Sequence, residues 1–441
     1  MSRYARTKPK RPPNPFTEHS RMAYLNNLRL SKLFTKTLRE SSKDEESTNA
    51  KLLTRGGFIF KNSAGIYTFL PLGWRVMEKI IGIIREEMNA IDGQEIFMPA
   101  LVEKKYWDAT GRWDVEIGFE VSGKGESKPG FVLGWSHEDI LTSMAPKFIN
   151  SYKDLPKAVY QFQTKFRNEP RARSGLLRGR EFLMKDLYSF HESEEDLFRY
   201  YDEVKNAYSG IFERCGLKTI YTLAGGGPFT ISNTHEFQVI SPMGEDSIMV
   251  CKNCPYAENR ELNTFINPDT DQCPKCEESD SISFEKSIEV GNIFPLGTKY
   301  SEAFGLSYPD KNGNKKPVVM GSYGIGVSRL MATIVEIHND KNGIIWPETV
   351  SPFKIHLIVL DAKNKEADKI YGDLEKIGAE VLYDDREGES AGEKFADADL
   401  IGCPIRMVVS ERTLKDNSVE IKRRNEDKAQ LIKTGEITGY V

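Results

Sequence analysis

Residues 161–191 carry the strongest structural signal in the chain, because two strand-like halves flank a loop crowded with arginine and glycine. The segment reads QFQTKFRNEPRARSGLLRGREFLMKDLYSFH, with five arginines from Arg167 to Arg180 inclusive. So many guanidinium groups in one loop are costly unless an anion is bound there, and their planar forks match phosphate oxygens. The pattern predicts a hairpin that binds a phosphate-rich ligand. A solvated turn held by salt bridges is the alternative.

A second segment, VVMGSYGIGVSRLMATIVE at 318–336, places three glycines within six residues just before a helix that contains Arg329. Glycine lets a ligand approach the backbone closely, and a helix start favours an anion. The segment is not a P-loop, because no Gly-Lys-Ser/Thr follows, and it lacks the third glycine of a dinucleotide fingerprint. We expect a strand–helix turn at a binding site. The same turn without a ligand is the alternative.

Four of the six cysteines form two close pairs, CKNC at 251–254 and CPKC at 273–276. Two such knuckles can supply four thiolates to one tetrahedral zinc ion without help from the rest of the protein. A closed shell leaves no position for water, so this Zn2+ would be structural. Disulfides or redox dithiols are the alternatives for the pairs, and iron is the alternative metal, although the spacing favours zinc. The predicted ligands are Cys251, Cys254, Cys273 and Cys276.

The periodicity of apolar residues predicts an α+β fold. Between Leu72 and Ile91 they recur at three- and four-residue intervals, which indicates an amphipathic helix. Further helices are expected over 24–45, over 192–215 and after Gly326. Strand-like segments lie at 95–98, 131–133, 159–166, 181–189, 237–240 and 318–320. Strands with few regular helix alternations favour an antiparallel core.

Residues 353–441 instead alternate strands and helices at short intervals, as a small α/β domain with a largely parallel sheet does. This segment has 15 Lys+Arg and 19 Asp+Glu, so any RNA contact must come from local patches such as 422–424.

The whole chain has 441 residues, 61 Lys+Arg and 65 Asp+Glu, which is the composition of a soluble globular protein. No stretch approaches the roughly 18 apolar residues of a membrane-spanning helix. Residues 1–20 form a basic, proline-rich tail, which we interpret as solvated and disordered; an RNA-contacting arm and a targeting sequence are the alternatives. The default location is cytoplasmic.

The arginine-rich and glycine-rich segments together resemble motifs 2 and 3 of the class II aminoacyl-tRNA synthetases. Motif 2 has the form FRxE, a loop, then Arg-xxx-Phe-xxx-Asp, and it is matched by Phe166–Glu169, Arg178, Phe182 and Asp186. Motif 3 is matched by Gly324, Gly326 and Arg329, and motif 1, a helix and a strand ending at proline, by 74–99. The resemblance implies an antiparallel catalytic sheet flanked by helices.

Longer sequence segments resemble those of the bacterial-type prolyl-tRNA synthetases, and this likeness extends from about residue 22 onward. The segments are FVLGWSHEDILT, GREFLMKDLYSFH, NTHEFQV, GSYGIGVSRL and DDREGESAGEKFADADLIGCP. This likeness implies a catalytic domain over 21–250 and 285–350, a four-cysteine insertion over 251–284 and an anticodon-binding domain over 351–441. It implies ATP with Mg2+, L-proline and tRNA(Pro) as ligands, and a homodimer with motif 1 at its interface.

The same resemblance assigns roles to residues. Arg167 and Arg329 would be catalytic: Arg167 would clamp the α-phosphate and the proline carboxylate, and Arg329 would sandwich the adenine with Phe182. Glu169 would accept the adenine amino group, and Arg178 is a further ATP-binding residue. The expected proline-binding residues are Ser136, Glu138, Arg167, His235, Ser322 and Gly324. Plain core packing is the alternative for Phe182, and a satisfied buried histidine is the alternative for His235.

Two departures from the family pattern matter. The Pro-Thr that precedes His-Glu in the family is Trp135-Ser136 here. Bacterial-type enzymes often carry a large insertion between motifs 2 and 3 that hydrolyses alanine from misloaded tRNA, whereas only the four-cysteine stretch occupies that place here. A pocket rejects a smaller substrate by only about 1–3 kcal/mol, so alanine mischarging and a separate trans-editing deacylase partner are expected.

Two other functions compete with this one. A class II synthetase for threonine, serine or glycine is the first, but a threonine enzyme would place metal ligands in its catalytic pocket, and these cysteines lie far in sequence from Glu138 and His235. A non-catalytic, RNA-binding paralogue is the second. Such paralogues usually lose the ATP-binding arginines, yet Arg167 and Arg329 are present.

Overall fold

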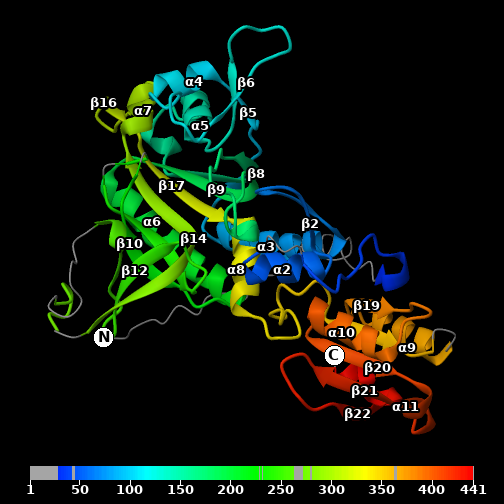
Figure 1. The fold of residues 1–441 in the computed structure, drawn as a ribbon. Coiled ribbons are helices and arrows are strands. Elements are labelled where there is room, and N and C mark those ends of the chain that lie inside the picture. Colours follow the sequence, from blue (N-terminus) through cyan, green and yellow to red (C-terminus); the bar gives the residue numbers. More distant parts are fainter. Residues whose placement is uncertain are drawn as a thin grey trace. The chain divides into compact units, whose positions relative to one another are not determined.

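The computed structural model describes residues 28–41, 45–227, 229–230, 232–262, 272–278, 281–361 and 365–440. The predicted basic tail lies outside these residues. The chain divides into a larger unit, Thr35–Pro352 with Leu400–Gly402, and a smaller one built from residues 28–34, Phe353–Asp399 and the segment from Cys403 onward (Figure 1). None of the helices in the described ranges is long and apolar enough to cross a membrane.

The larger unit is built on a nine-stranded sheet in the order β11-β10-β13-β12-β14-β17-β9-β8-β4. Neighbouring strands are antiparallel except in the β4–β8 and β10–β13 pairs, which confirms the predicted antiparallel α+β core. The strands are β4 (Gln94–Glu95), β8 (Lys157–Phe166), β9 (Glu181–His191), β10 (Ile220–Ala224), β11 (Thr234–Ile240), β12 (Asp246–Cys251), β13 (Ala257–Asn259), β14 (Ile282–Gly297) and β17 (Val319–Gly326).

The strand predicted at 95–98 is shorter than expected. It ends at Glu95 because the backbone of Met98 bonds to side chains instead of to a neighbouring strand. The Met98 amide donates to Gln161 Oε1 over 2.9 Å, and the Met98 carbonyl accepts from the Gln163 side chain.

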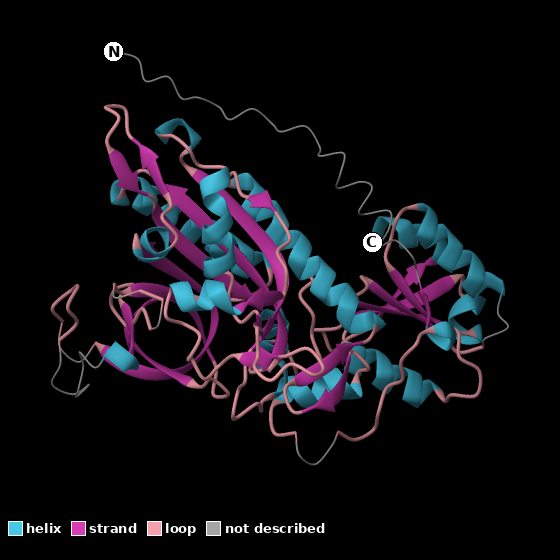
Figure 2. Ribbon diagram, turned by 90° about the horizontal axis from the view of Figure 1, so that it is seen from above, coloured by secondary structure: helices cyan, strands magenta, loops and turns pink. Residues whose placement is uncertain are grey.

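Two long helices cover one face of the sheet (Figure 2). Helix α3 (Pro71–Ala90) begins at a proline, and α6 (Glu194–Arg214) begins after Ser193, whose side chain caps the Asp196 amide. Lys185 of β9 contacts Met88 of α3 and Tyr208 of α6, which places both helices on that face. The apolar stripe of α3 is buried inside its own chain. Helix α8 (Val327–Ile337) follows β17 directly.

The opposite face of the sheet carries a smaller layer. It contains α5 (Glu138–Met144), α7 (Lys299–Ala303), α4 (Lys104–Ala109) and the three-stranded sheet β5-β7-β6 (Leu101–Glu103, Phe131–Leu133, Phe119–Val121). Ser322 of β17 bonds to Glu138 of α5, which fixes the side of the sheet on which this layer lies. The remaining elements are α2 (Thr48–Arg55) and the hairpins β2–β3 (Ile59–Ser63, Ile66–Phe69) and β15–β16 (Ser307–Pro309, Lys315–Pro317).

The smaller unit has a six-stranded sheet in the order β1-β19-β18-β20-β21-β22. Its first four strands are parallel and the last two pair antiparallel, as predicted for an α/β segment. The strands are β1 (Leu28–Arg29), β18 (Ile355–Val359), β19 (Val381–Asp384), β20 (Ile405–Val409), β21 (Ser418–Arg423) and β22 (Gln430–Lys433). The helices are α9 (Lys365–Lys376), α10 (Ala391–Ile401), α11 (Glu411–Lys415) and α12 (Ile437–Tyr440).

The predicted helix over 24–45 is wrong for the residues that the structure describes. Leu28–Arg29 form β1 beside β19, and the first α-helix described begins at Thr48. A polar segment has no apolar stripe to stabilise a helix, whereas the open edge of β19 satisfies its backbone. Arg29 also pairs with Asp368 and Asp385, at 2.9 and 3.2 Å. Residues 28–34 therefore belong to the smaller unit, although the sequence placed them in the catalytic domain.

Candidate active site

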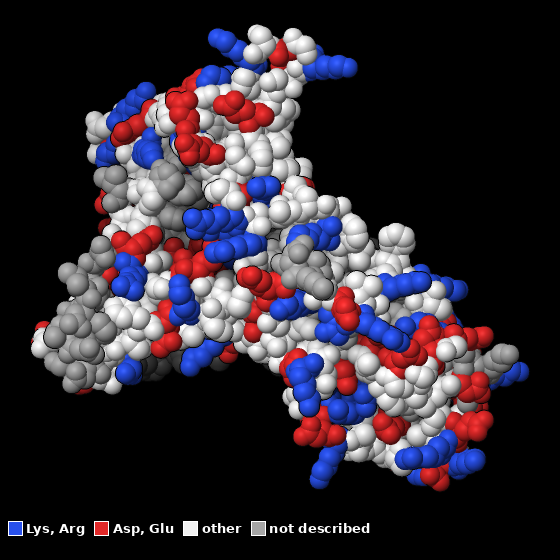
Figure 3. Space-filling view, viewed as in Figure 1, with Lys and Arg blue, Asp and Glu red and all other residues white. Residues whose placement is uncertain are grey.

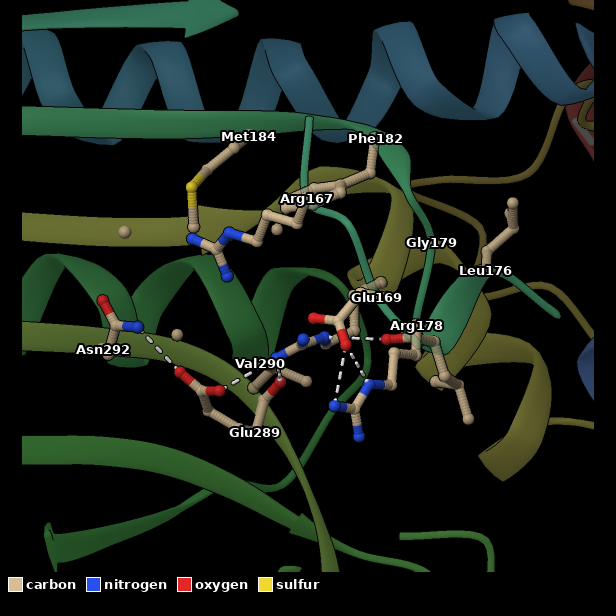
Figure 4. Close-up of a pocket in the computed structure, with 15 residues that line it drawn as sticks. Arg167, Glu169, Leu176, Arg178, Gly179, Phe182, Met184, Glu289, Val290 and Asn292 are labelled. Carbon is tan, nitrogen blue, oxygen red and sulfur yellow. Dashed lines mark hydrogen bonds and ion pairs between the residues drawn. The ribbon is translucent and has the colours of Figure 1, made fainter. Parts of the chain in front are cut away.

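A pocket lies where β8, β9, β14 and β17 meet the start of α8 (Figure 4). Six of the residues predicted from the arginine-rich and glycine-rich segments line it: Arg167, Glu169, Arg178, Phe182, Gly324 and Arg329. The antiparallel pairing of β9 with β17 brings the two segments side by side, with Asp186 opposite Gly324. A Cβ at Gly324 would lie 2.9 Å from Asn292 Oδ1, so a larger residue here would displace the Asn292 side chain in the pocket.

Glu169 is held by an arginine of its own loop. The Nε of Arg178 donates to Glu169 Oε2 over 2.8 Å, and Nη2 lies 2.7 Å from the same oxygen. Arg178 also bonds to Glu245. Both contacts end on one carboxylate oxygen, which leaves the other available to a ligand donor.

Arg329 is anchored at the far side of the pocket. Its Nη1 donates to Glu289 Oε2 over 2.9 Å, and its Nε donates to the Leu177 carbonyl over 3.0 Å. Asn292 donates to the other oxygen of Glu289 over 2.7 Å (Figure 4). The guanidinium plane of Arg329 is therefore fixed before any ligand arrives.

Arg167 differs from both of these arginines. Its Nε is buried without a hydrogen-bond partner among the described residues, and no dashed line reaches its guanidinium in Figure 4. Its Cζ lies 5.3 Å from the centre of the Phe182 ring. Burial lowers the pKa of Arg167, and the nearby Arg329 lowers it further, while Glu289, Glu169 and Glu138 oppose them. A buried cation of this kind is stabilised by an incoming anion.

A second cluster holds Ser136, Glu138 and Ser322. Glu138 is 3% exposed, and its Oε1 accepts from Ser322 Oγ over 3.1 Å. Arg112 reaches both neighbours: Nη2 donates to Ser136 Oγ over 2.7 Å, and Nη1 lies 3.4 Å from Glu138 Oε2. Sequence reasoning missed Arg112, since it lies in a short polar loop that looks like any other charged loop.

The structure does not bring His235 into this cluster. His235 pairs with Ile293, and Ile293 pairs with Tyr323, so these side chains share one face of the sheet. Ser322, next to Tyr323, points to the other face. His235 Nδ1 lies 3.0 Å from Tyr201 OH of α6, and its ring stacks on Tyr221 at 4.4 Å. Burial lowers its pKa to about 4. His235 is a satisfied histidine on the helix-covered face, which was the alternative for this residue.

Three carboxylates beside Arg329 were also missed by sequence reasoning. Gln238 donates to both Glu236 and Asp246, at 2.8 and 2.9 Å, and Glu289 lies close by. Burial, followed by repulsion from Glu289, raises the pKa of Glu236 to about 8. These carboxylates come from three strands that are brought together only in the folded sheet. A single acidic residue within a strand-like segment does not by itself indicate a binding site.

The four cysteines meet at one point. Their sulfur atoms all lie within 4.8 Å of one another, and the nearest contacts are Cys254–Cys273 at 3.6 Å and Cys251–Cys276 at 3.7 Å. Tetrahedral zinc with Zn–S bonds of about 2.3 Å separates its sulfurs by about 3.8 Å. All four thiols are free, so the disulfide alternative does not hold. The predicted cluster is confirmed and is consistent with zinc.

An antiparallel sheet with an arginine-bearing hairpin and a glycine-rich strand leading to a helix arginine defines the class II aminoacyl-tRNA synthetases. Residues 119–338 match the tRNA synthetase class II core domain (G, H, P, S and T). Residues 349–441 match the anticodon binding domain. The predicted fold class is confirmed.

Individual relatives narrow the class. The chain is 34% identical to the proline–tRNA ligase of Bacillus cytotoxicus over 564 aligned positions, which cover 94% of this chain and 99% of the relative. It is 33% identical to the proline–tRNA ligase of Bacillus anthracis over the same coverage. The chain belongs to the proline–tRNA ligases, the class II enzymes that join proline to tRNA.

Solved structures show the same fold at lower identity. Prolyl-tRNA synthetase from Cryptosporidium parvum, complexed with L-proline and AMP, matches with a TM-score of 0.72 at 20% identity, covering 88% of this chain and 72% of that one. Prolyl-tRNA synthetase from Giardia lamblia, in complex with prolyl-adenylate, also has a TM-score of 0.72 at 20% identity, covering 88% and 74%.

Proposed function

We propose that this chain forms prolyl-adenylate from L-proline and ATP in the described pocket and then transfers proline to tRNA(Pro). The observation that carries this proposal is the state of Arg167. Arg178, Arg329 and Arg112 are each paired with a carboxylate, whereas the Arg167 guanidinium has no such partner among the described residues. It is therefore the group that meets the two anions of the reaction, the proline carboxylate and the α-phosphate.

The second cluster and the pocket fit the two substrates. In the cluster, Glu138 and Ser136 offer oxygens to the secondary ammonium of proline, and Ser322 orients Glu138. In the pocket, the free oxygen of Glu169 suits the adenine amino group, and Phe182 and Arg329 offer a ring face and a guanidinium plane to the base. The relatives solved with L-proline and AMP, and with prolyl-adenylate, support this division.

The chemistry follows from positioning. A carboxylate oxygen of proline attacks the α-phosphorus in line, the bond from that phosphorus to the bridging oxygen breaks, and pyrophosphate leaves with its electron pair. A terminal ribose hydroxyl of the tRNA then attacks the prolyl carbonyl, and AMP leaves. Arg167 holds the reacting oxygens together and stabilises charge on the α-phosphate, so the first step needs no protein base.

The carboxylates near Arg329 fit the Mg2+ that accompanies ATP. Glu289, Glu236 and Asp246 supply hard oxygen donors. Burial and then repulsion from Glu289 raise the pKa of Glu236, and a divalent cation would stabilise its charged form. Mg2+ held by these residues would supply positive charge to the phosphates of ATP. Zn2+ in the four-cysteine cluster would in turn be structural, because four thiolates close its shell.

Contact with tRNA must come from local groups. Acidic and basic side chains are interspersed on both units in the face shown in Figure 3. Of the patch predicted at 422–424, Arg423 is exposed, but Arg424 is 8% exposed and donates to the Asp399 carbonyl. Arg423 and the half-buried Lys422 of β21 are the members of that patch left for the tRNA.

We further propose that the enzyme is a homodimer without editing in cis. Near motif 1, Phe97 is 77% exposed and Trp74 is 43% exposed, although the stripe of α3 is already buried. Large exposed aromatic groups of this kind favour a partner subunit, and the mass of the particle in solution tests this.

The proposal that editing in cis is absent rests on length. The alignment with the Bacillus relative spans 564 positions while this chain has 441 residues, so well over a hundred positions of the relative are aligned with no residue of this chain.

The test of the main proposal is amino-acid-dependent exchange of pyrophosphate into ATP, run with proline, alanine, threonine, serine and glycine. We expect strong exchange with proline, weak exchange with alanine, and a loss of roughly 100- to 1000-fold in Arg167→Ala. Arg214→Ala, on the helix-covered face, should keep wild-type activity. Full exchange in Arg167→Ala would contradict the role of this residue, and the absence of exchange in folded wild-type protein would contradict the function.

A further inference from the structure

One guanidinium organises the segment that is proposed to receive the amino acid. Arg112 lies between α4 and β6 and is 4% exposed. Its Nη2 bonds Ser136 Oγ at 2.7 Å, and its Nη1 bonds Asp139 and lies 3.4 Å from Glu138. A single side chain therefore holds three of the four residues from 136 to 139.

Arg112 is itself fixed by an aromatic surface. Its Cζ lies 4.0 Å from the centre of the Trp135 ring, and Trp135 stacks on Trp107 at 5.0 Å with an interplanar angle of 26°. A buried cation over an indole face is attracted by the ring quadrupole. Trp135 stands where the family pattern has proline, so this support is a feature of the present chain.

Asp139 and Glu138 do not receive the same number of strong hydrogen bonds. Asp139 accepts from Arg112 through one oxygen and from Thr110 through the other, and both contacts are short. Among the described residues, Glu138 has only the 3.1 Å bond from Ser322 and the long 3.4 Å contact with Arg112. Asp139 is thus saturated, whereas Glu138 keeps room for another donor.

The balance of charge also indicates that Asp139 is the partner of Arg112 and that Glu138 is left for a ligand. One buried guanidinium faces two buried carboxylates, so Arg112 can match only one of these two negative charges. The other titratable groups that face this cluster are Tyr300 and Lys299 of α7, Tyr188 of β9, His137, Lys165 of β8 and Arg167. Lys165 is paired with Asp186, and Arg167 is the group proposed to bind the anions of the substrates. Lys299 is turned to the Phe229 carbonyl, 3.3 Å away.

We propose that Arg112 is a positioning residue for the amino acid: anchored by Asp139 and Trp135, it orients Ser136 and Glu138 so that one carboxylate remains for the cationic amine of the substrate. This inference rests on the proposed function. It predicts that Arg112 governs the selection of a charged ring nitrogen and has little influence on ATP.

The test compares proline with tetrahydrofuran-2-carboxylate, a neutral-ring analogue, as a competitive inhibitor of pyrophosphate exchange. In Arg112→Met we expect the KM for proline to rise roughly 10- to 100-fold, the size of a lost charged hydrogen bond, with the KM for ATP nearly unchanged. The analogue should lose much less affinity, because it lacks the ammonium. Arg112→Lys keeps the positive charge without the two-pronged guanidinium, so its KM for proline should lie between those of the wild type and Arg112→Met.

A pH profile adds a readout that packing alone would not give. Burial raises the pKa of Asp139 to about 6, although Arg112 opposes it. Without Arg112 the pKa of Asp139 rises further, so at pH 7 more of Asp139 is neutral and the cluster presents less negative charge to the ammonium. The KM for proline in Arg112→Met should therefore fall as the pH rises from 6 to about 8.5, whereas the wild-type KM should change little above pH 7.

Arg386→Met is the matched control, since Arg386 also bridges two carboxylates, Asp384 and Asp397, but in the smaller unit. It should leave tRNA-independent exchange unchanged. Asp139→Asn, which removes the anchor of Arg112, should reproduce the proline effect if Arg112→Met fails to fold. Equal losses for proline, the analogue and ATP would overturn the inference. Failure of wild-type exchange would instead overturn the proposed function.

Discussion

Beneath the pocket, a buried lysine links the active-site strands to the Ser-His-Glu segment. Lys165 Nζ lies 2.8 Å from Asp186 Oδ1 and also contacts His137 Nδ1. His137 Nε2 lies 3.0 Å from the Pro99 carbonyl, so it carries the ring proton and Nδ1 accepts from the lysine. Burial lowers the pKa of His137 to about 4, which keeps the ring neutral in this role.

This ion pair predicts a large stability effect. Burial alone would raise the pKa of Asp186, but Lys165, together with His137 and the hydrogen bond from Gln161, outweighs burial and the pKa is lowered. A depressed carboxyl pKa contributes stability that is present above the unfolded value of about 3.9 and is lost as the pH falls through the folded value. Lys165→Met leaves Asp186 buried and unpaired, so we expect a loss of about 3–5 kcal/mol at pH 7 in urea unfolding.

In Lys165→Met the sign of the pH dependence reverses. The pKa of Asp186 then rises above its unfolded value, so protonation stabilises the fold and the deficit shrinks toward pH 5. Lys376→Met removes the exposed Lys376–Asp373 pair and should cost about 1 kcal/mol or less. A Lys165→Met protein as stable as wild type at pH 7 would contradict this account.

At the scale of single residues, the sequence predicted those site residues that belong to a motif with a recognisable spacing. Arg167, Glu169, Phe182 and Arg329 line one pocket because a hairpin and a strand–helix turn place them there. His235 was misplaced because alternation along a strand does not tell which face a helix covers. Arg112 and Lys165 act through partners distant in sequence, which no local pattern reveals.

Among the elements, the predictions were best where one periodicity dominates. The long α3 and α6 and the strands β8 and β9 match their expected ranges closely, because their patterns run for many residues. The failures, at 24–45 and 95–98, fall on segments whose backbone partners come from elsewhere in the fold. Tertiary pairing decided both of them.

The four-cysteine element gives a prediction of its own. The Cys-x-x-Cys turns follow β12 and precede β14, and these two strands pair from Cys251–Ile282 onward. Cys254→Ser should therefore abolish stoichiometric zinc, measured by atomic spectroscopy, and lower the midpoint of thermal unfolding. Cys215→Ser, at a buried thiol outside the cluster, should leave the zinc content unchanged. A wild-type protein that purifies folded and without bound metal would contradict the assignment.

At the scale of the whole molecule, the shorter length of this chain relative to the Bacillus relatives predicts that alanine attached to tRNA(Pro) is not removed by this enzyme. We expect the purified enzyme to form alanyl-tRNA(Pro) slowly, because a pocket for proline excludes the smaller side chain only weakly. It should not release alanine from that tRNA faster than spontaneous hydrolysis. The measurement follows labelled alanine on tRNA(Pro), with a Bacillus relative tested in parallel. Enzyme-catalysed release by this chain alone would overturn the proposal and the need for a deacylase partner.

The pairing of β1 with β19 has a consequence for how the protein is made. Arg29 and its partner Asp385 are 356 residues apart, so the first strand leaves the ribosome roughly 20–70 s before the strand it must join. During that interval the edge of β19 that Leu28 and Arg29 join has not yet been made. The smaller unit completes its sheet only by recruiting a segment synthesised well before the rest of that sheet, so its assembly order cannot follow its synthesis order.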